Sequence, residues 1–151
     1  MKIKLAITAL AAIVLMIACG KDKFTTVPQV KVKSISPKVV TRGNIIEFKS
    51  SYTDQEGDID SVYIVHKWHN GASSAPARDT FRYPFDSFNV PSNTKEADII
   101  VTFSYDVSID GYSLLVPSPS QDTTATLGIV LVDKKGNRSD YKESDKIRLI
   151  K

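Results

Sequence analysis

The stretch that decides the fold is Ala97-Asp98-Ile99-Ile100-Val101-Thr102-Phe103-Ser104-Tyr105-Asp106-Val107. From Ile99 to Tyr105, every second side chain is large and apolar or aromatic. A period of two is the pattern of a β-strand that buries one face. The segment is also rich in β-branched and aromatic residues, which favour strands. It therefore predicts a strand with one face against a core.

Similar segments recur on both sides of this strand. They predict further strands at 30–35, 45–52, 61–68, 80–88, 114–116, 125–132 and 146–150. The nearly continuous apolar run 125–132 predicts a central strand, whereas Pro84 marks 80–88 as an edge or a bulge. No segment has the period of an amphipathic helix, and turn residues recur at the spacing of a sandwich. The fold class predicted is an all-β, antiparallel, immunoglobulin-like sandwich of about seven to nine strands.

The chain starts with a pattern of a different kind. Met1–Lys4 is basic, and residues 5–18 are an apolar run of fourteen that only Thr8 interrupts. A spanning helix needs about 20 residues, so the run is typical of a secretory signal. A short uncleaved membrane anchor is the alternative. Cys19, the only cysteine, follows directly.

The residues around Cys19 resemble the lipobox of a bacterial lipoprotein signal, with Met16 where leucine is usual. The resemblance implies that Cys19 becomes the first mature residue and carries diacylglycerol and a fatty acid such as palmitate. Lys21 and Asp22 partly match the export signal of surface lipoproteins of the Bacteroidetes type, and no aspartate follows Cys19 directly. The implied location is the outer membrane, facing either the periplasm or the surface. Acyl chains then hold the protein on the membrane without a helix.

This interpretation divides the chain into three parts. Residues 1–18 form the signal peptide, residues 19–28 the lipidated cysteine and a tether, and residues 29–151 one sandwich domain. Cleavage leaves 133 residues, with eighteen basic and seventeen acidic side chains. One domain of this size can bury a substantial core. The lysines are scattered, so no nucleic-acid partner is predicted.

Two turns resemble those of PKD-like and other bacterial immunoglobulin-like domains. The acidic turn 54–58 precedes a strand, and Asp133 to Ser139 resembles an Asp-x-x-Gly-Asn-x-Ser turn near the end of such domains. There Asp and Asn side chains cap the turn, and Gly136 takes a positive φ. Trp68 would suit the core tryptophan of the third strand. With a single cysteine, the disulfide of antibody domains is absent.

A cluster of carboxylates is the first candidate site. Asp54, Glu56, Asp58 and Asp60 supply four hard oxygen ligands within seven residues, which suggests calcium. The EF-hand pattern does not fit, because Gly57 is the fourth residue of the loop and Val65 the twelfth. Asp106, Asp110 or Asp133 could join a site at the end of a sandwich. A solvated acidic turn without metal is the alternative that the sequence favours.

Aromatic side chains form the second candidate site. Trp68, Phe81, Tyr83 and Phe85 could present a platform to a sugar or a protein, or pack as core and cross-strand pairs. The two histidines, His66 and His69, lie three apart, so they cannot face one ion from a strand. We expect exposed strand histidines rather than a zinc site.

No motif for a nucleophile, a phosphate loop or a cofactor is present, so no enzyme activity is predicted. The function predicted is a non-enzymatic binding or accessory module, anchored in the outer membrane, for a protein or a glycan. A structural envelope component that pairs sheet edges with a partner is the alternative, and a small hydrolase is a more distant one.

Overall fold

The computed structural model describes residues 25–69, 77–116 and 121–151. The predicted signal peptide, Cys19 and the tether as far as residue 24 lie outside the described residues. So do most of the loop predicted after His69 and the Pro-Ser loop 117–120. Within the described part, no helix has the length and apolar character that crossing a membrane requires.

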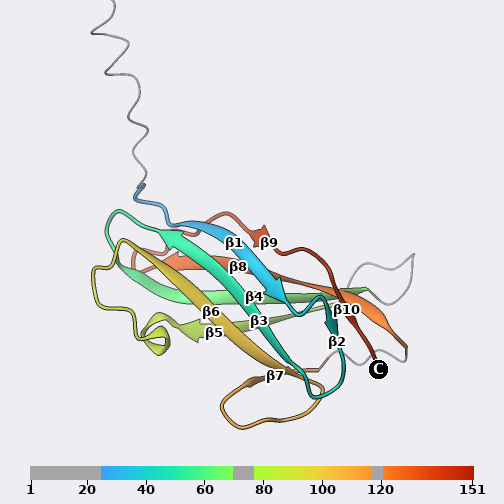
Figure 1. Ribbon diagram of the computed structural model, residues 1–151. Helices are drawn as coiled ribbons and strands as arrows, with labels where there is room; N and C mark the ends of the chain where they lie inside the picture. The colour runs from blue at the N-terminus through green and yellow to red at the C-terminus, as the bar shows by residue number, and fades with distance from the viewer. Residues whose placement is uncertain (1–24, 70–76, 117–120) are drawn as a thin grey trace, which may run out of the picture.

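Two β-sheets pack face to face (Figure 1). The first has the order β1-β3-β6-β7. Its strands are β1 (Gln29–Ser36), β3 (Ile45–Thr53), β6 (Glu96–Tyr105) and β7 (Ser113–Leu115). The second has the order β2-β10-β8-β4-β5, with β9 also paired to β8. Its strands are β2 (Val39–Val40), β4 (Ile59–His69), β5 (Ala77–Pro84), β8 (Thr123–Asp133), β9 (Lys142–Glu143) and β10 (Ile147–Leu149). The prediction of an all-β sandwich is confirmed, but the sheets are mixed rather than purely antiparallel, because β2 pairs parallel with β10 and β7 pairs parallel with β6.

The core lies between the two sheets and follows the predicted period of two. In β6 the alternate residues Ile99, Val101, Phe103 and Tyr105 are all buried. They face apolar side chains of the second sheet, and the rings of Phe81 and Phe103 lie with their centroids 5.4 Å apart. Burial of about 150–250 Å² per aromatic ring contributes strongly to stability. The alternation read from the sequence therefore identified the inner face.

β8 is the central strand of the second sheet, as its apolar run predicts. It pairs antiparallel with β4 along nearly its whole length and with β10 on the other side. Its alternate residues Leu127, Ile129 and Leu131 are almost completely buried. β7 lies at the edge of the first sheet, where it runs parallel to β6. The prediction of an edge strand at 114–116 is thus also confirmed.

Two local predictions were wrong or incomplete. The segment 80–88 is not one strand: β5 ends at Pro84, and Phe85–Phe88 forms the 3-10 helix η1. Proline has no N–H to continue the ladder, which explains the end of the strand. The two-residue strands β2 and β9 were not predicted, because two residues carry no measurable period.

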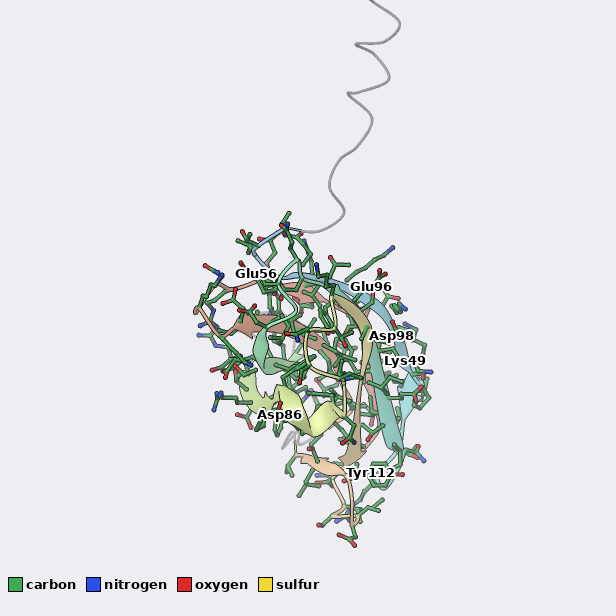
Figure 2. All side chains as sticks on the ribbon, turned by 90° about the vertical axis from the view of Figure 1, so that its left-hand side faces the viewer. Lys49, Glu56, Asp86, Glu96, Asp98 and Tyr112 are labelled. Atoms are coloured by element: carbon green, nitrogen blue, oxygen red, sulfur yellow. The ribbon has the colours of Figure 1, made fainter. Side chains whose placement is uncertain are left out.

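The described chain begins at one end of the sandwich. There the backbone N–H of Gln55 donates to the carbonyl of Thr25 over 3.0 Å, so the acidic turn touches the entering chain. Figure 2 looks at this end and labels Glu56 close to where the chain enters. β4 and β8 extend between this end and the opposite end of the sandwich (Figure 1). We call these the proximal end, carrying the turn 54–58, and the distal end, carrying His69 and Thr123.

Candidate functional site

The acidic turn after β3 is held by a buried carboxylate. Asp54 is 0% exposed, and its Oδ2 accepts a hydrogen bond from the backbone N–H of Asp58 over 3.0 Å. The backbone N–H of Asp54 donates to the carbonyl of Lys95 over 2.8 Å. Asp54 therefore fixes the turn from inside, and the solvent does not reach it.

A second turn, after β8, brings another carboxylate to the same end. Asp133 Oδ1 accepts the backbone N–H groups of Lys135 (2.9 Å) and Asn137 (2.8 Å). Its Oδ2 accepts the side-chain amide of Asn137 over 2.8 Å. Gly136 has a φ of +85°, which glycine adopts without strain. The predicted capping of this turn by Asp and Asn is confirmed.

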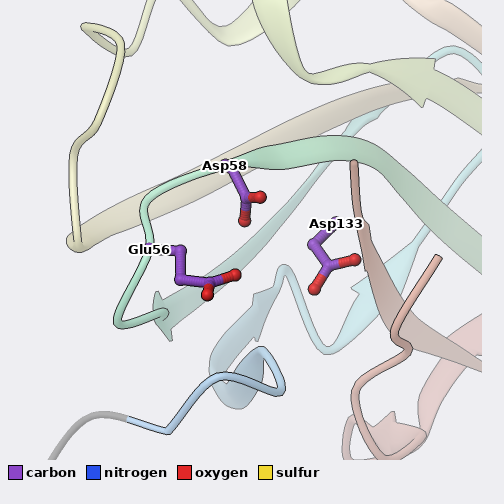
Figure 3. A group of neighbouring side chains, drawn as sticks. All are labelled: Glu56, Asp58 and Asp133. Atoms are coloured by element: carbon purple, nitrogen blue, oxygen red, sulfur yellow. The ribbon is translucent and has the colours of Figure 1, made fainter. Parts of the chain in front are cut away.

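The two turns meet because β4 and β8 pair. Ile59 lies opposite Asp133, and the backbone N–H of Lys134 donates to the carbonyl of Asp58 over 2.9 Å. Glu56, Asp58 and Asp133 each place a carboxylate oxygen within 4.8 Å of the others. Figure 3 shows the three carboxyl groups turned toward a shared space. We call these three residues the proximal carboxylate cluster.

Burial and nearby negative charges both act on Asp58 within this cluster. The pKa of Asp58 is raised, first by loss of solvent and then by the negative charges of Asp54, Glu56 and Asp133. Lys135 offsets part of this effect, since its Nζ lies 2.5 Å from Glu56 Oε1 and 2.6 Å from Oε2. The same contact raises the pKa of Lys135. A group of carboxylates with one lysine beside it retains a net negative charge.

The structure brings together only part of the carboxylate set read from the sequence. Asp60 is exposed and pairs with Arg82, with Oδ2 to Nη2 at 3.2 Å, rather than joining the cluster. Asp133, which the sequence offered as an alternative, takes part instead. Asp106 pairs with Arg42 over 3.1 Å. Pairing of β4 with β8, which sets Ile59 opposite Asp133, brings Asp58 and Asp133 together across 75 positions of sequence, and no local motif contains the cluster.

The distal end carries a wide hollow that sequence reasoning missed. Its volume is about 570 Å³. The lining residues are all of polar or charged types, although their carbon atoms form part of the surface: His69, Gln121, Asp122, Thr123, Thr124, Lys146 and Arg148. Arg148 pairs with Asp122, with Nη2 to Oδ2 at 3.0 Å. No sequence signal marks this hollow, because its residues come from the ends of β4, β8 and β10.

The predicted aromatic residues do not form one exposed platform. Phe85 is only 8% exposed and packs edge-on against Tyr52, with ring centroids 5.5 Å apart. Phe81, Tyr83 and Trp68 are partly buried against the core. The hydroxyl of Tyr83 lies 2.8 Å from the hydroxyl oxygen of Ser113 in a hydrogen bond. These aromatic groups mainly join the two sheets, and Trp68 lies at the half-buried end of the core rather than at its centre.

His66 corrects the expectation of exposed histidines. It is 2% exposed and stacks on Trp68, with ring centroids 4.8 Å apart. Its Nε2 is buried and has no hydrogen-bond partner among the described residues. His66 faces inward because it lies two and four residues after the buried Ile64 and Val62 on the same side of β4. Histidine is a polar residue type, so the sequence did not indicate that this position faces the core.

The burial of His66 predicts a pH-dependent stability. Burial lowers the pKa of His66 to about 4, although Asp79 acts in the opposite direction. The unfolded chain binds a proton near pH 6.5, so between that pH and about 4 the unfolded state carries the extra proton. Stability therefore falls as the pH falls through this window, by roughly 2 kcal/mol from pH 7 to pH 5. Urea unfolding at both pH values measures the loss.

The matched control for this prediction is His66→Phe, which keeps an aromatic ring against Trp68 and removes the titrating group. Its unfolding free energy should lose most of the difference between pH 7 and pH 5. An unchanged pH dependence in His66→Phe would show that other groups cause it.

Comparisons with known proteins identify no family. No protein-family model and no curated protein matches the sequence. Several solved structures align with this chain at low sequence identity. The sporulation control protein Spo0M of Bacillus subtilis is 11% identical, with a TM-score of 0.44, over 84% of this chain and 51% of that one. A Niemann-Pick type C2 protein from the Japanese carpenter ant is 14% identical, with a TM-score of 0.45, over 87% of this chain and 95% of that one.

The alkylpurine DNA glycosylase AlkC of Pseudomonas fluorescens is 10% identical, with a TM-score of 0.47, over 93% of this chain and 34% of that one. This chain thus spans about half of Spo0M and a third of AlkC.

Proposed function

We propose that this protein is a lipid-anchored, non-enzymatic binding module of the bacterial cell envelope. The basic start, the apolar run and Cys19 support the anchor, and the outer membrane is its proposed location. The stretch from Cys19 to Thr25 reaches at most about 20 Å when fully extended. The proximal end would therefore lie close to the lipid, and the distal end would project away from it.

We also propose that the domain is immunoglobulin-like. The order β1-β3-β6 in one sheet and β10-β8-β4-β5 in the other supports this class. It corresponds to the ABE strands facing the GFC strands of immunoglobulin domains, with β5 as an added edge strand. Such domains present loops at the two ends of the sandwich, so a ligand site at one end agrees with the fold.

The distal hollow is the observation that carries the binding function. β4 has 11 residues, so its two ends lie roughly 35 Å apart. The hollow at its far end would be the most accessible part of an anchored molecule. Its volume of about 570 Å³ is that of a typical small-ligand site.

The lining of the hollow favours an acidic glycan as the ligand. Protein interfaces have apolar or aromatic anchors at their centre, and the residues that line this hollow include none beyond the His69 ring. Hydroxyl, amide and ammonium groups suit a polar ligand rich in hydroxyls. Lys146 has no acidic partner among the described residues, whereas Arg148 pairs with Asp122. The charged groups of the lining therefore leave one net positive charge, which fits a carboxylate or phosphate on the glycan.

Binding to an array of acidic and neutral bacterial glycans tests this function. Lys146→Glu should weaken binding of acidic glycans about tenfold, because it replaces an attraction by a repulsion worth at least 1.4 kcal/mol. Lys31→Glu, an equal charge change on an exposed residue at the proximal end, is the control and should leave binding unchanged. Equal effects of the two variants, or equal binding of neutral glycans, would contradict the proposal. If the domain binds a protein and no glycan, the result would favour a protein partner.

One observation favours the structural alternative. Among the described residues, β6 pairs on its outer side only at Phe103–Tyr105, so the edge 97–102 is open there and carries the 48% exposed Ile100. An open strand edge is a place where another chain can add a strand. A stable oligomer in sedimentation, without glycan binding, would favour this function.

A further inference from the structure

We propose that the proximal end of the sandwich binds one calcium ion through Glu56, Asp58 and Asp133. The site is independent of the proposed glycan site, which lies at the opposite end. It differs from the calcium set suggested by the local sequence, because Asp133 enters from a different strand and Asp60 is excluded.

The spacing of the three ligands fits one ion. Calcium binds oxygen at 2.3–2.6 Å, so two oxygens on one ion lie at most about 5 Å apart. The ligand oxygens of Glu56, Asp58 and Asp133 all lie within 4.8 Å of one another. The carboxyl groups also face a common space (Figure 3). The cluster is therefore compact enough for all three to bind the same ion.

Two buried carboxylate oxygens that accept no hydrogen bond are a further observation in support of the calcium site. Asp54 is 0% exposed, and its Oδ1 has no hydrogen-bond partner among the described residues. Its Oδ2 is bonded to the N–H of Asp58, so this carboxylate faces the turn that carries the cluster. Asp58 Oδ1 is likewise buried and unpartnered. Buried charged oxygens are normally paired or bound to a metal. Asp58 Oδ1 belongs to the cluster itself, and the Asp54 carboxylate is hydrogen-bonded to the backbone of Asp58.

The charges around this space favour a cation. Asp54, Glu56, Asp58 and Asp133 supply four negative charges, and the Lys135 ammonium at Glu56 supplies one positive charge. The Lys135 side chain is 59% exposed, so it can leave Glu56 for solvent without loss of core packing. We infer that calcium replaces the lysine at Glu56 and also neutralises Asp58. Lys135 thus competes with the ion.

The ligand types select calcium among the common metals. The cluster contains carboxylates only, whereas zinc sites generally include histidine or cysteine. Magnesium requires near-ideal octahedral geometry and usually keeps several waters with one or two carboxylates. Calcium accepts three or more carboxylates in an irregular arrangement, which is what two meeting turns provide.

Isothermal titration of the full-length chain, purified in detergent and stripped with EDTA, tests the site. We expect one calcium ion per chain with a Kd of about 0.1–1 mM, the range of extracellular modules, and weaker magnesium binding. Calcium at about 10 mM should raise the melting temperature by several degrees, since the ion binds only the folded state.

Four variants locate the ion. Asp58→Asn and Glu56→Gln should each weaken binding at least tenfold, and the partly exposed Glu56 keeps the test valid if Asp58→Asn fails to fold. Lys135→Met should tighten binding several-fold, because it removes the competing ammonium. Asp60→Asn is the control, and it should bind as the parent does.

The outcomes are distinct. Loss of binding in the cluster variants with tighter binding in Lys135→Met would support the site. No calcium heat with the parent chain, or equal loss in Asp60→Asn and Asp58→Asn, would overturn it. If calcium has no effect and Asp58→Asn alone stabilises the chain at neutral pH, protons balance the charge of the cluster and the proposal is wrong.

Discussion

Replacing Cys19 with serine should abolish fatty-acid labelling and move the protein from the membrane fraction to the soluble fraction. Each buried methylene of an acyl chain contributes about 0.8 kcal/mol to membrane binding, and two or more chains give stable anchoring. Serine lacks the thiol that would receive the diacylglycerol. Labelled palmitate and membrane sedimentation of expressed protein measure the two effects, and we expect the change to be nearly complete.

Thr26→Ser in the tether is the control for this experiment and should be labelled and sedimented like the parent protein. The alternative anchor is an uncleaved apolar segment at residues 5–18. In that case the parent protein would carry no palmitate, and the Cys19→Ser variant would sediment with the membrane unchanged. That result would contradict the lipoprotein proposal and leave the fold untouched.

Gly57→Val should destabilise the domain by about 2 to 6 kcal/mol. Gly57 has a φ of +66°, a conformation that costs a β-branched residue about 1–3 kcal/mol. A Cβ at this position would also lie 2.5 Å from the backbone carbonyl carbon of Asn93. The neighbouring loop cannot move away cheaply, because the Asp54 N–H and the Tyr52 hydroxyl donate to Lys95 (2.8 Å) and Thr94 (2.9 Å) carbonyls. Overpacking adds about 1–3 kcal/mol.

Gly111→Val separates the two causes. Gly111 has a φ of +82°, but a Cβ there would meet nothing within 4 Å. Urea unfolding of this variant should show the backbone cost alone, about 1–3 kcal/mol. If Gly57→Val costs no more than Gly111→Val, the contact with Asn93 does not restrict the turn. Because Gly57 lies between Glu56 and Asp58, the same variant should also disturb the proximal carboxylate cluster.

Local signals predicted the main strands well. Ile99 to Tyr105 and the run 125–132 carry enough residues for a clear period or a clear apolar run, and each became a long strand. The turn at Asp133 was predicted in detail, since its capping depends only on residues within the turn. Local signals failed where few residues carry the element, as in β2, or where a proline ends it, as at Pro84.

The sites depended on contacts that no local pattern contains. His66 was expected at the surface because its type is polar, but the sheet-to-sheet packing buries it with Val62 and Ile64 on the same face of β4. The distal hollow joins residues from three strand ends. The sequence nonetheless marked the acidic turn as a candidate, and it offered Asp133 as one of several possible partners.

The sequence by itself determined the all-β class, the buried faces of the long strands and the two turns, because period, turn chemistry and glycine conformation act over a few neighbouring residues. Only the tertiary structure decided which carboxylates meet. Pairing of β4 with β8 sets Ile59 opposite Asp133 and so brings two turns from distant parts of the chain together. Asp60 lies at the irregularity between Ile59 and Ser61 in this pairing, and its exposed side chain reaches Arg82 of β5 instead of the cluster.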